Sequence, residues 1–184
     1  MNESSGRREH AFHLDPGLTK VDDSAFVAPG VVLVGDVHVG SRATLWYGVI
    51  VRGDCEKIRI ADDANVQDGT VIHADPGFPA LIGEGATIGH RCVIHGATIG
   101  AGAMVGMGSV VMNGAVIGAG SIVGAGALVT QGKEFPPNSM ILGSPARRAR
   151  ALTDEERHTT AFATEHYVAA GAAYRAAGFD RTGS

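Results

Sequence analysis

The sequence predicts an all-β solenoid, a parallel β-helix followed by a C-terminal α-helix, and three observations support this prediction. From Ile99 to Val129 an aliphatic residue returns at every sixth position, and glycine follows most of these residues. An alanine or serine stands four positions after each of the first five. A period of six matches neither the 3.6 of an α-helix nor the 2 of an ordinary strand. Fixed hexapeptide repeats are typical of a solenoid of parallel strands.

The hexad phase predicts which residues point into the core. In each hexad we expect the aliphatic residue to point inward and its successor outward, while glycine allows the chain to turn a corner. The inward positions extend back from Ile99 to Val39, with one longer corner after Val51 and a non-repeating segment at residues 74–81. Asp75-Pro76-Gly77 in that segment is a turn signal.

One irregularity leaves two residues as candidates for the same inward position. Ile88 and Ile99 are eleven positions apart, where two hexads would need twelve. Either Val93 or Ile94 points inward between them. Ile94 is preferred, because an inward Val93 would turn the larger Ile94 outward.

Length and composition exclude several classes of protein. The 184 residues suit one domain, and 27 glycines with few aromatic residues fit a fold of tight corners. A net charge of -4 offers no basic surface, so we expect no nucleic-acid partner. No apolar run reaches the roughly eighteen residues that cross a bilayer, so we expect no membrane partner. Residues 1–13 are polar and lack the apolar core of a signal peptide, which predicts a cytoplasmic protein.

The chain divides into five predicted parts. These are a polar N-terminal tail over residues 1–17, the β-helix over 18–132, a loop over 133–152, a helix over 153–178 packed on the β-helix, and a tail over 179–184. Thr153 and Glu156 form a capping box at the start of the helix. A stripe at helical spacing is expected to face the β-helix or a neighbouring subunit, and Gly171 could interrupt it. Its members are Ala163, Tyr167, Ala170, Tyr174 and Ala177.

Two cysteines are expected to be buried thiols. Cys55 and Cys92 each stand four residues after an inward aliphatic residue, in the position of the small inward side chain. A buried thiol is the ordinary state of such a residue in a cytoplasmic protein, so neither a disulfide nor metal binding is predicted.

Grouping the hexads in threes places two histidines together. Val51, Ile72 and Ile94 then occupy the same face of three successive coils, so the residues after them, Arg52, His73 and His95, point outward from that face. Stacked strands lie about 4.8 Å apart. This spacing suits two imidazoles that share a metal ion at about 2.0–2.1 Å per bond.

A third histidine is expected to come from another subunit. His90 lies at a corner, five residues before His95, and roughly 3.3 Å per residue separates the two by about 15 Å along the chain. One subunit cannot easily close three imidazoles around one ion, so the sequence predicts a symmetric oligomer, and a triangular prism favours a trimer. Gln67 is expected below the coil that carries His90. The other histidines are expected to be surface, packing or inert residues: His10, His13, His38, His158 and His166.

The order and spacing of the polar residues resemble the signature of the γ-class carbonic anhydrases. The resemblance is carried by Arg52-Gly53-Asp54, Asn65-Val66-Gln67-Asp68 with His73 five residues later, and His90 with His95 five later. It implies a left-handed β-helix that forms a homotrimer, with a metal ion at each subunit interface. It also implies that His73 and His95 bind the ion from one chain and His90 from the neighbouring chain.

The resemblance implies roles for the other polar residues. Arg52 and Asp54 resemble the pair that ties adjacent subunits together. Gln67 resembles the side chain that hydrogen-bonds the metal-bound hydroxide, with Asn65 and Asp68 in support.

A tyrosine on the C-terminal helix reaches the site in some members of this family. Tyr167 is the better match here, and the alternative is that it only packs against the coil as part of the helix stripe. The best-studied form has a long acidic loop with a glutamate that shuttles protons, whereas residues 75–80 are short and carry no glutamate, and Cys55 stands where that form has glutamate. The chain therefore resembles the shorter-loop branch.

The ligand set predicts the chemistry. Three neutral imidazoles leave the +2 charge of the ion uncompensated and one position open. Water there can have its pKa lowered from 15.7 to near 7, which supplies a metal-bound hydroxide that attacks CO2. We therefore expect a metal-dependent carbonic anhydrase that interconverts CO2 and bicarbonate at trimer interfaces. Zinc is the default ion, and Fe2+ or Co2+ could occupy the same ligands.

Three alternatives remain open from the sequence. The same metal hydroxide could hydrolyse a thioester, since proteins of phenylacetate catabolism look similar. An acyltransferase shares the hexapeptide repeat but generally uses one histidine as a base and no metal, so the set of three histidines counts against it. A non-catalytic binding protein of the siderophore type would not need the complete ligand pattern.

Overall fold

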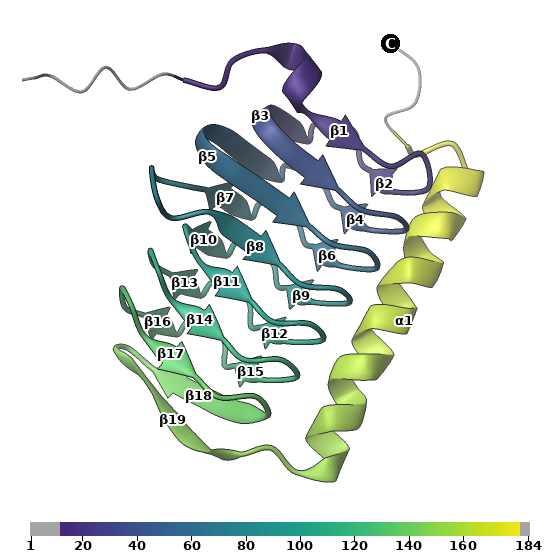
Figure 1. The fold of residues 1–184 in the computed structure, drawn as a ribbon. Helices are drawn as coiled ribbons and strands as arrows, with labels where there is room; N and C mark the ends of the chain where they lie inside the picture. Colours follow the sequence, from purple (N-terminus) through teal and green to yellow (C-terminus); the bar gives the residue numbers. More distant parts are fainter. Residues whose placement is uncertain (1–11, 181–184) are drawn as a thin grey trace, which may run out of the picture.

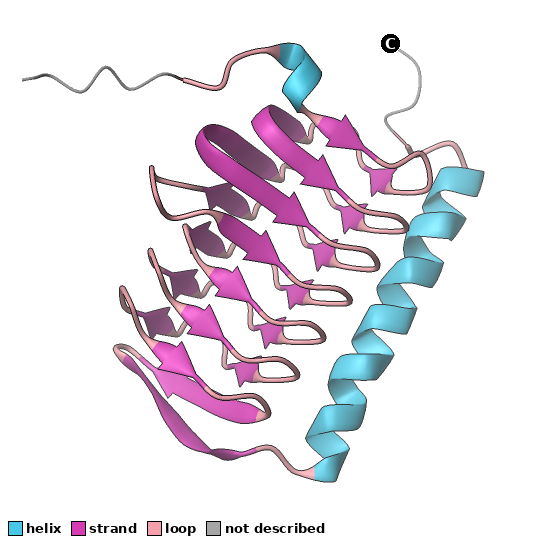
Figure 2. Ribbon diagram, viewed as in Figure 1, coloured by secondary structure: helices cyan, strands magenta, loops and turns pink. Residues whose placement is uncertain are grey.

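The computed structural model describes residues 12–180, which form a β-solenoid with one C-terminal helix. Short parallel strands stack turn upon turn, and the helix α1 (Asp154–Ala176) runs along the outside of the stack (Figure 1). A short 3-10 helix, η1 (Pro16–Leu18), lies at the N-terminal end of the solenoid (Figure 2). The predicted fold class, a hexapeptide-repeat β-helix with a C-terminal helix, is confirmed.

One sheet forms the face that the helix covers. Seven of its strands are parallel, and an antiparallel strand closes the C-terminal end. In spatial order the strands are β2 (Phe26–Val27), β4 (Thr44–Leu45), β6 (Asn65–Val66), β9 (Thr87–Ile88), β12 (Met104–Val105), β15 (Ile122–Val123), β18 (Ser139–Gly143) and β19 (Ala146–Ala151).

A second sheet supplies the two other faces, because its two long strands, β3 (Val32–Val39) and β5 (Ile50–Ile60), run through both. One face continues from the first half of β5 through β7 (Val71–His73), β10 (Val93–His95), β13 (Val110–Val111) and β16 (Leu128–Val129). The other includes β1 (Lys20–Val21), β8 (Ala80–Ile82), β11 (Thr98–Ile99), β14 (Val116–Ile117) and β17 (Glu134–Phe135).

The inward aliphatic residues stack in register along the axis of the solenoid. Val51 pairs with Ile72, and Ile72 pairs with Ile94. All three side chains are fully buried, whereas Val93 is 37% exposed. The preference for Ile94 over Val93 as the inward residue is confirmed. Because each turn repeats this ladder, outward side chains of successive turns are also brought side by side.

The solenoid extends further than the sequence predicts. Residues 133–152 are expected to form a loop, but they contain β17, β18 and β19. Phe135 and Ile141 continue the six-residue spacing from Val129 and are buried in the core. The repeat is hard to detect here because Pro136 follows the inward Phe135, whereas glycine follows Ile99 and Ile117 on the same face.

The helix begins where the capping box predicts. The Thr153 hydroxyl accepts a hydrogen bond from the Glu156 backbone, and the Glu156 carboxylate accepts one from Thr153. The helix ends at Ala176 and runs uninterrupted through Gly171, which is buried. The sequence suggests that Gly171 could interrupt the packing stripe, but Tyr167 and Tyr174 on either side of it both pack against Trp46, so the stripe continues past it. A Cβ at that position would lie 2.5 Å from Cγ2 of Thr44, so the glycine allows the helix to approach the coil closely.

Aromatic side chains join the helix to the solenoid. The Trp46 ring centroid lies 5.0 Å from that of Tyr174, 5.7 Å from Tyr167 and 5.1 Å from Phe26. Nearer the N-terminus of the helix, the Thr164 hydroxyl donates to the backbone oxygen of Gly85 at 2.7 Å. These contacts confirm that the helix packs on the β-helix.

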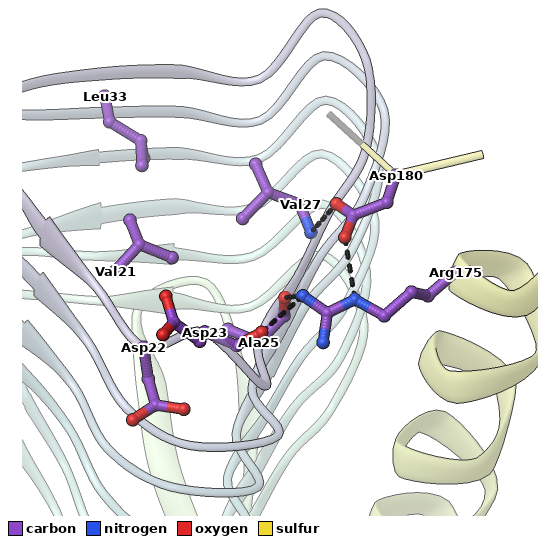
Figure 3. A pocket seen from close by; sticks show the side chains of 8 residues that line it. All are labelled: Val21, Asp22, Asp23, Ala25, Val27, Leu33, Arg175 and Asp180. Carbon is purple, nitrogen blue, oxygen red and sulfur yellow. Dashed lines mark hydrogen bonds and ion pairs between the residues drawn. The ribbon is translucent and has the colours of Figure 1, made fainter. Parts of the chain in front are cut away.

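The C-terminal end of the helix is fastened to the first turn of the solenoid (Figure 3). Arg175 donates to the Asp180 carboxylate at 2.8 Å and to the backbone oxygen of Ala25 at 3.0 Å. Asp180 in turn accepts a hydrogen bond from the backbone of Val27 at 3.3 Å. This clamp lines a cavity of about 310 Å³ whose remaining wall includes the apolar side chain of Leu33.

The cysteines differ from each other. Both are free thiols, and Cys92 is buried as predicted. Cys55 is only partly buried, which corrects the expectation, because β5 turns a corner at this position. Of the histidines of the N-terminal tail, His10 lies outside the described residues, and the backbone of His13 donates to the backbone oxygen of Asp54 at 2.7 Å.

We predict that Gly171→Ala destabilises the protein. Alanine normally stabilises a helix interior by about 1 kcal/mol relative to glycine, but overpacking costs roughly 1–3 kcal/mol. The new Cβ would meet Cγ2 of Thr44 at 2.5 Å and Cβ of Phe26 at 3.1 Å. Urea unfolding at neutral pH should therefore give a free energy of unfolding that is lower by about 1 kcal/mol.

Thr44→Ser provides the matched background. It removes the clashing methyl group and keeps the hydroxyl that accepts a hydrogen bond from Nε1 of Trp46 at 3.2 Å. In this background Gly171→Ala should be neutral or stabilising. The same change in stability in both backgrounds would contradict the steric explanation.

We also predict that acid weakens the start of the helix. The hydrogen bond from Arg150 and the backbone hydrogen bond from Thr153 lower the pKa of Glu156 from 4.5 to about 2. Because the folded-state pKa is below the ordinary value, the stabilisation is present above pH 4.5 and is lost as the pH falls toward 2. Thermal unfolding should therefore show a gap between wild type and Glu156→Gln that narrows over this range.

Candidate metal centre

His73 and His95 lie one above the other at the ends of neighbouring parallel strands. β7 pairs with β10 in a register that places His73 beside His95, and β5 places Arg52 beside His73. The two ring centroids lie 5.0 Å apart, and Nδ1 of His73 is 3.0 Å from Nε2 of His95. The structure thus brings these two predicted ligands together.

The far nitrogen of His73 is held by a carboxylate. Nε2 of His73 lies 3.2 Å from Oδ1 of Asp54, and within the same chain Arg52 donates to both Asp54 oxygens, at 2.7 and 2.6 Å. Burial raises the pKa of Asp54, but the hydrogen bonds from Arg52 and His73 outweigh it, and the net shift is downward. Burial, followed by the charge of Arg52, lowers the pKa of His73, so this imidazole is neutral at pH 7.

The far nitrogen of His95 is held by an amide that sequence reasoning missed. Nδ1 of His95 lies 2.8 Å from Oδ1 of Asn113, and Nδ2 of Asn113 donates to Asp75 at 2.8 Å. Asn113 comes two residues after Val111, the register partner of Ile94. Its place at the corner of the coil that follows the coil of His95 is the signal that could have found it. Asp75 was recognised only as part of a turn.

His90 lies across a corner from the other two histidines. Nδ1 of His90 is 2.9 Å from Oδ2 of Asp68 in the preceding turn. The corner itself is formed by Arg91, a non-glycine residue with a φ of 54°. His90 and Gln67 both line a cavity of about 250 Å³ that also borders the helix.

A row of hydrogen bonds orients the side chain of Gln67. Its Nε2 donates to Oδ1 of Asn65 at 3.1 Å, and Nδ2 of Asn65 donates to the Thr87 hydroxyl at 2.8 Å. All three residues are buried. The predicted placement of Gln67 next to the turn that carries His90 follows from the pairing of β6 with β9.

Tyr167 of the helix lines the same cavity as Gln67 and His90. Burial, and then the nearby charge of Asp68, raise the pKa of Tyr167, so its hydroxyl stays protonated at neutral pH. The ring also packs against Trp46 with a centroid separation of 5.7 Å. Both interpretations of Tyr167, as a residue at the cavity and as a packing residue, therefore have structural support.

Two groups of possible ligands occur among the described residues. Within each group the ligand atoms lie within 4.8 Å of one another. One group consists of Asp54, Cys55 and His73, and the other of His73, Asp75 and His95. His90 belongs to neither group. Burial, and then the Asp54 charge, raise the pKa of the Cys55 thiol, so the thiol without a bound metal is protonated at neutral pH.

The hydrogen bonds of His73 and His95 fit a divalent cation between the two rings. Nδ1 of His95 faces a carbonyl oxygen and Nε2 of His73 faces a carboxylate, and both oxygens only accept. The hydrogens therefore sit on these outer nitrogens, and the two nitrogens that face each other at 3.0 Å present lone pairs. A cation between them removes the repulsion, and zinc binds imidazole nitrogen at about 2.0–2.1 Å.

An apolar column lies on the same face as the paired histidines. Each of its residues stands one position before an inward residue, so its side chain points outward, and the strand registers align these side chains. Val32, Ile50 and Val93 are each well exposed. Sequence reasoning did not identify this surface. The members of the apolar column are Val32, Ile50, Val71, Val93, Val110 and Leu128.

Comparisons with known proteins identify a family and several similar proteins. The family described as bacterial transferase hexapeptide (six repeats) matches residues 79–111 and 96–131. A relative from Methanocaldococcus jannaschii, named "Probable carbonic anhydrase", is 49% identical over 71% of this chain and 82% of its own length. A relative from Geobacillus kaustophilus, named carbonic anhydrase, is 38% identical over 86% of this chain and 87% of its own length.

The chain belongs to the γ-carbonic anhydrase family of hexapeptide-repeat proteins. The solved structure of a hexapeptide transferase family protein from Anaplasma phagocytophilum is also similar, with a TM-score of 0.81 and 40% identity over 85% of this chain and 92% of that one.

Among the described residues, no helix combines the length and hydrophobicity needed to cross a membrane.

Three histidines predicted to be peripheral lie away from the facing nitrogens. His38 is 3.6 Å from Asp36 on another face of the solenoid. His166 stacks against Phe162 on the helix, and the exposed His158 lies near the helix N-terminus.

Proposed function

We propose that this protein is a metal-dependent carbonic anhydrase that catalyses the reversible hydration of CO2 to bicarbonate at sites between subunits. The observation that carries this proposal is the pair of lone-pair nitrogens on His73 and His95, 3.0 Å apart, with the outer nitrogen of each ring held by a hydrogen-bond acceptor. Such outer partners orient metal-binding imidazoles and set their tautomers.

A bound divalent ion would supply a Lewis acid that lowers the pKa of water from 15.7 to near 7. His73 is neutral at pH 7, as a ligand must be. Imidazole nitrogen suits zinc, and it also suits Fe2+ or Co2+, so the donor set fits all three ions.

The chain's own residues would position the reactants. The Gln67 amide, held by Asn65, retains its oxygen and one N–H for groups in the cavity that it lines with His90. This amide can orient water for attack or hold an oxygen of bicarbonate. Asp68 holds the outer nitrogen of His90, which leaves Nε2 of that ring for the ion. Tyr167 contributes a protonated hydroxyl to the same cavity.

We place the third ligand, His90, on a neighbouring subunit of a homotrimer. His90 comes just before the corner at Arg91. His95 comes after this corner, at the end of β10, where it lies beside His73 of β7. In a ring of identical subunits, the part of one subunit that carries His90 would meet the part of its neighbour that carries His73 and His95. The apolar column runs along the same face, and exposed apolar surface of this kind marks sites of protein association.

A second candidate is hydrolysis of a small thioester with the same residues. The cavity beside His90 and Gln67 has a volume of about 250 Å³, and its wall includes Met104, Met107 and Ala163. This is more apolar space than a triatomic substrate needs, and it could accept a short acyl group.

We predict that replacing any one of the three histidines removes the metal. His73→Ala, His90→Ala and His95→Ala should lower metal content, measured by inductively coupled plasma mass spectrometry, and reduce CO2 hydration in stopped flow by roughly 100-fold or more. His38→Ala, on another face, is the control and should change neither. Circular dichroism should show that all variants fold.

Unchanged metal content in His90→Ala would refute the assignment of His90 as a ligand. Thioester hydrolysis without CO2 hydration by the wild-type protein would favour the second candidate.

We predict that Val93→Asp separates the subunits. The charge would be placed in the middle of the apolar column, at a side chain that is 37% exposed in the single chain. Gel filtration with light scattering should show a trimer for wild type and a monomer for the variant, which should also lose metal. Phe162→Asp, at a 69% exposed helix position, is the control and should remain a trimer. A wild-type monomer with full metal content would rule out the interfacial site.

A further inference from the structure

We propose that Asp75 and Asn113 act as a positioning pair that sets the tautomer of His95 and so keeps its Nε2 available to a metal ion. The metal-binding part of this inference rests on the proposed function. The tautomer itself is a property of the metal-free chain. Neither residue belongs to the polar signature by which the sequence marked the site.

The direction of each hydrogen bond follows from the chemistry of the groups. The carboxylate of Asp75 only accepts, so the atom of Asn113 that lies 2.8 Å from it is the amide nitrogen. The Asn113 oxygen then faces Nδ1 of His95 at 2.8 Å. Because an amide oxygen also only accepts, Nδ1 of His95 carries the hydrogen, and Nε2 carries the lone pair.

The opposite tautomer would not be able to bind metal. A hydrogen on Nε2 would point at His73, and the lone pair on Nδ1 would face the Asn113 oxygen. Without Asp75 the Asn113 amide could rotate and donate to Nδ1, which would favour that tautomer. Asp75 therefore acts on His95 through Asn113, although it does not hydrogen-bond the ring itself.

The local backbone holds this pair in place. A Cβ on Gly96, directly after His95, would lie 2.3 Å from Oδ1 of Asn113 and 2.7 Å from Cβ of Phe78. Glycine at this position, with a φ of 56°, leaves the space in which the amide lies. The backbone of Phe78 donates to the backbone oxygen of Asp75 at 2.8 Å across the turn, which holds the backbone of Asp75 in place.

Direct binding of the ion by Asp75 is the competing explanation, because Asp75 lies within 4.8 Å of ligand atoms of His73 and His95. The contacts argue against it. The Asp75 oxygen lies 3.9 Å from Nδ1 of His95, the nitrogen on the outer side of the ring. Nε2 of the same ring faces His73. The carboxylate is thus on the wrong side of His95 to share an ion with Nε2.

The first experiment measures the tautomer in metal-free protein. Long-range proton–nitrogen NMR correlations with 15N-labelled histidine should show His95 protonated on Nδ1 in wild type and in the swapped variant Asp75→Asn/Asn113→Asp, in which the carboxylate at position 113 accepts from the ring and from the amide at position 75. Asn113→Leu, which cannot accept, and Asp75→Asn, which frees the amide to rotate, should shift His95 toward the tautomer protonated on Nε2. An unchanged tautomer in both of these variants would overturn the proposal.

The second experiment measures zinc affinity by competition with a chelator. Asn113→Leu and Asp75→Asn should each weaken binding by about 10–100-fold, the usual cost of losing an outer partner. The swapped variant Asp75→Asn/Asn113→Asp, which keeps an acceptor for Nδ1 of His95, should retain most of the wild-type affinity. Asp63→Asn is the control, since Asp63 pairs with Arg42 away from His95, and it should bind as wild type does.

The double variant separates a positioning pair from a ligand. If Asp75 acts through Asn113, the double variant Asp75→Asn/Asn113→Leu should lose no more affinity than Asn113→Leu alone. If Asp75 is itself a ligand, Asp75→Asn should cost more than Asn113→Leu and the two losses should add, which would overturn the proposal. Wild-type protein that binds no zinc would defeat the proposed function, while the tautomer measurement would still test the pair.

Discussion

The parallel register between successive turns is the constraint on which the rest of this structure depends. Each backbone ladder holds an outward residue directly beside its counterpart in the next turn, about 4.8 Å away. Arg52, His73 and His95 form such a row, and the apolar column forms another on the same face. A shift of one residue would exchange inward for outward side chains. The buried aliphatic core therefore holds the histidines in place even though they do not belong to it.

Register alone brings the rings together, but it does not prepare them for a cation. That preparation comes from acceptors placed on the outer side of each ring: Asp54 for His73, Asn113 for His95 and Asp68 for His90. Each acceptor directs a hydrogen outward and leaves the opposite nitrogen with a lone pair. Arg52 in turn holds Asp54, and Asp75 holds Asn113. The site is therefore a set of short hydrogen-bonded chains in which the outer members determine what the inner nitrogens can bind.

The helix contributes to the site as well as to stability. Trp46, Phe26, Tyr167 and Tyr174 fasten it to the covered sheet, and Gly171 lets it approach closely. The same packing places Tyr167 over the cavity that Gln67 and His90 line. In the proposed trimer this half of the site on one subunit would meet the His73 and His95 half on the next. Packing and chemistry therefore share one face of the helix.

The sequence by itself determined the repeat, the inward residues as far as Val129, the stacking of His73 with His95 and the capping box at Thr153, because each depends on local spacing. It did not reveal the last strands, where Pro136 hides the repeat, or the partial burial of Cys55 at a corner. The Asp75–Asn113 pair and the apolar column were decided only by the tertiary structure. Their members are far apart in the chain and resemble ordinary surface residues, so contact between turns is what gives them a common role.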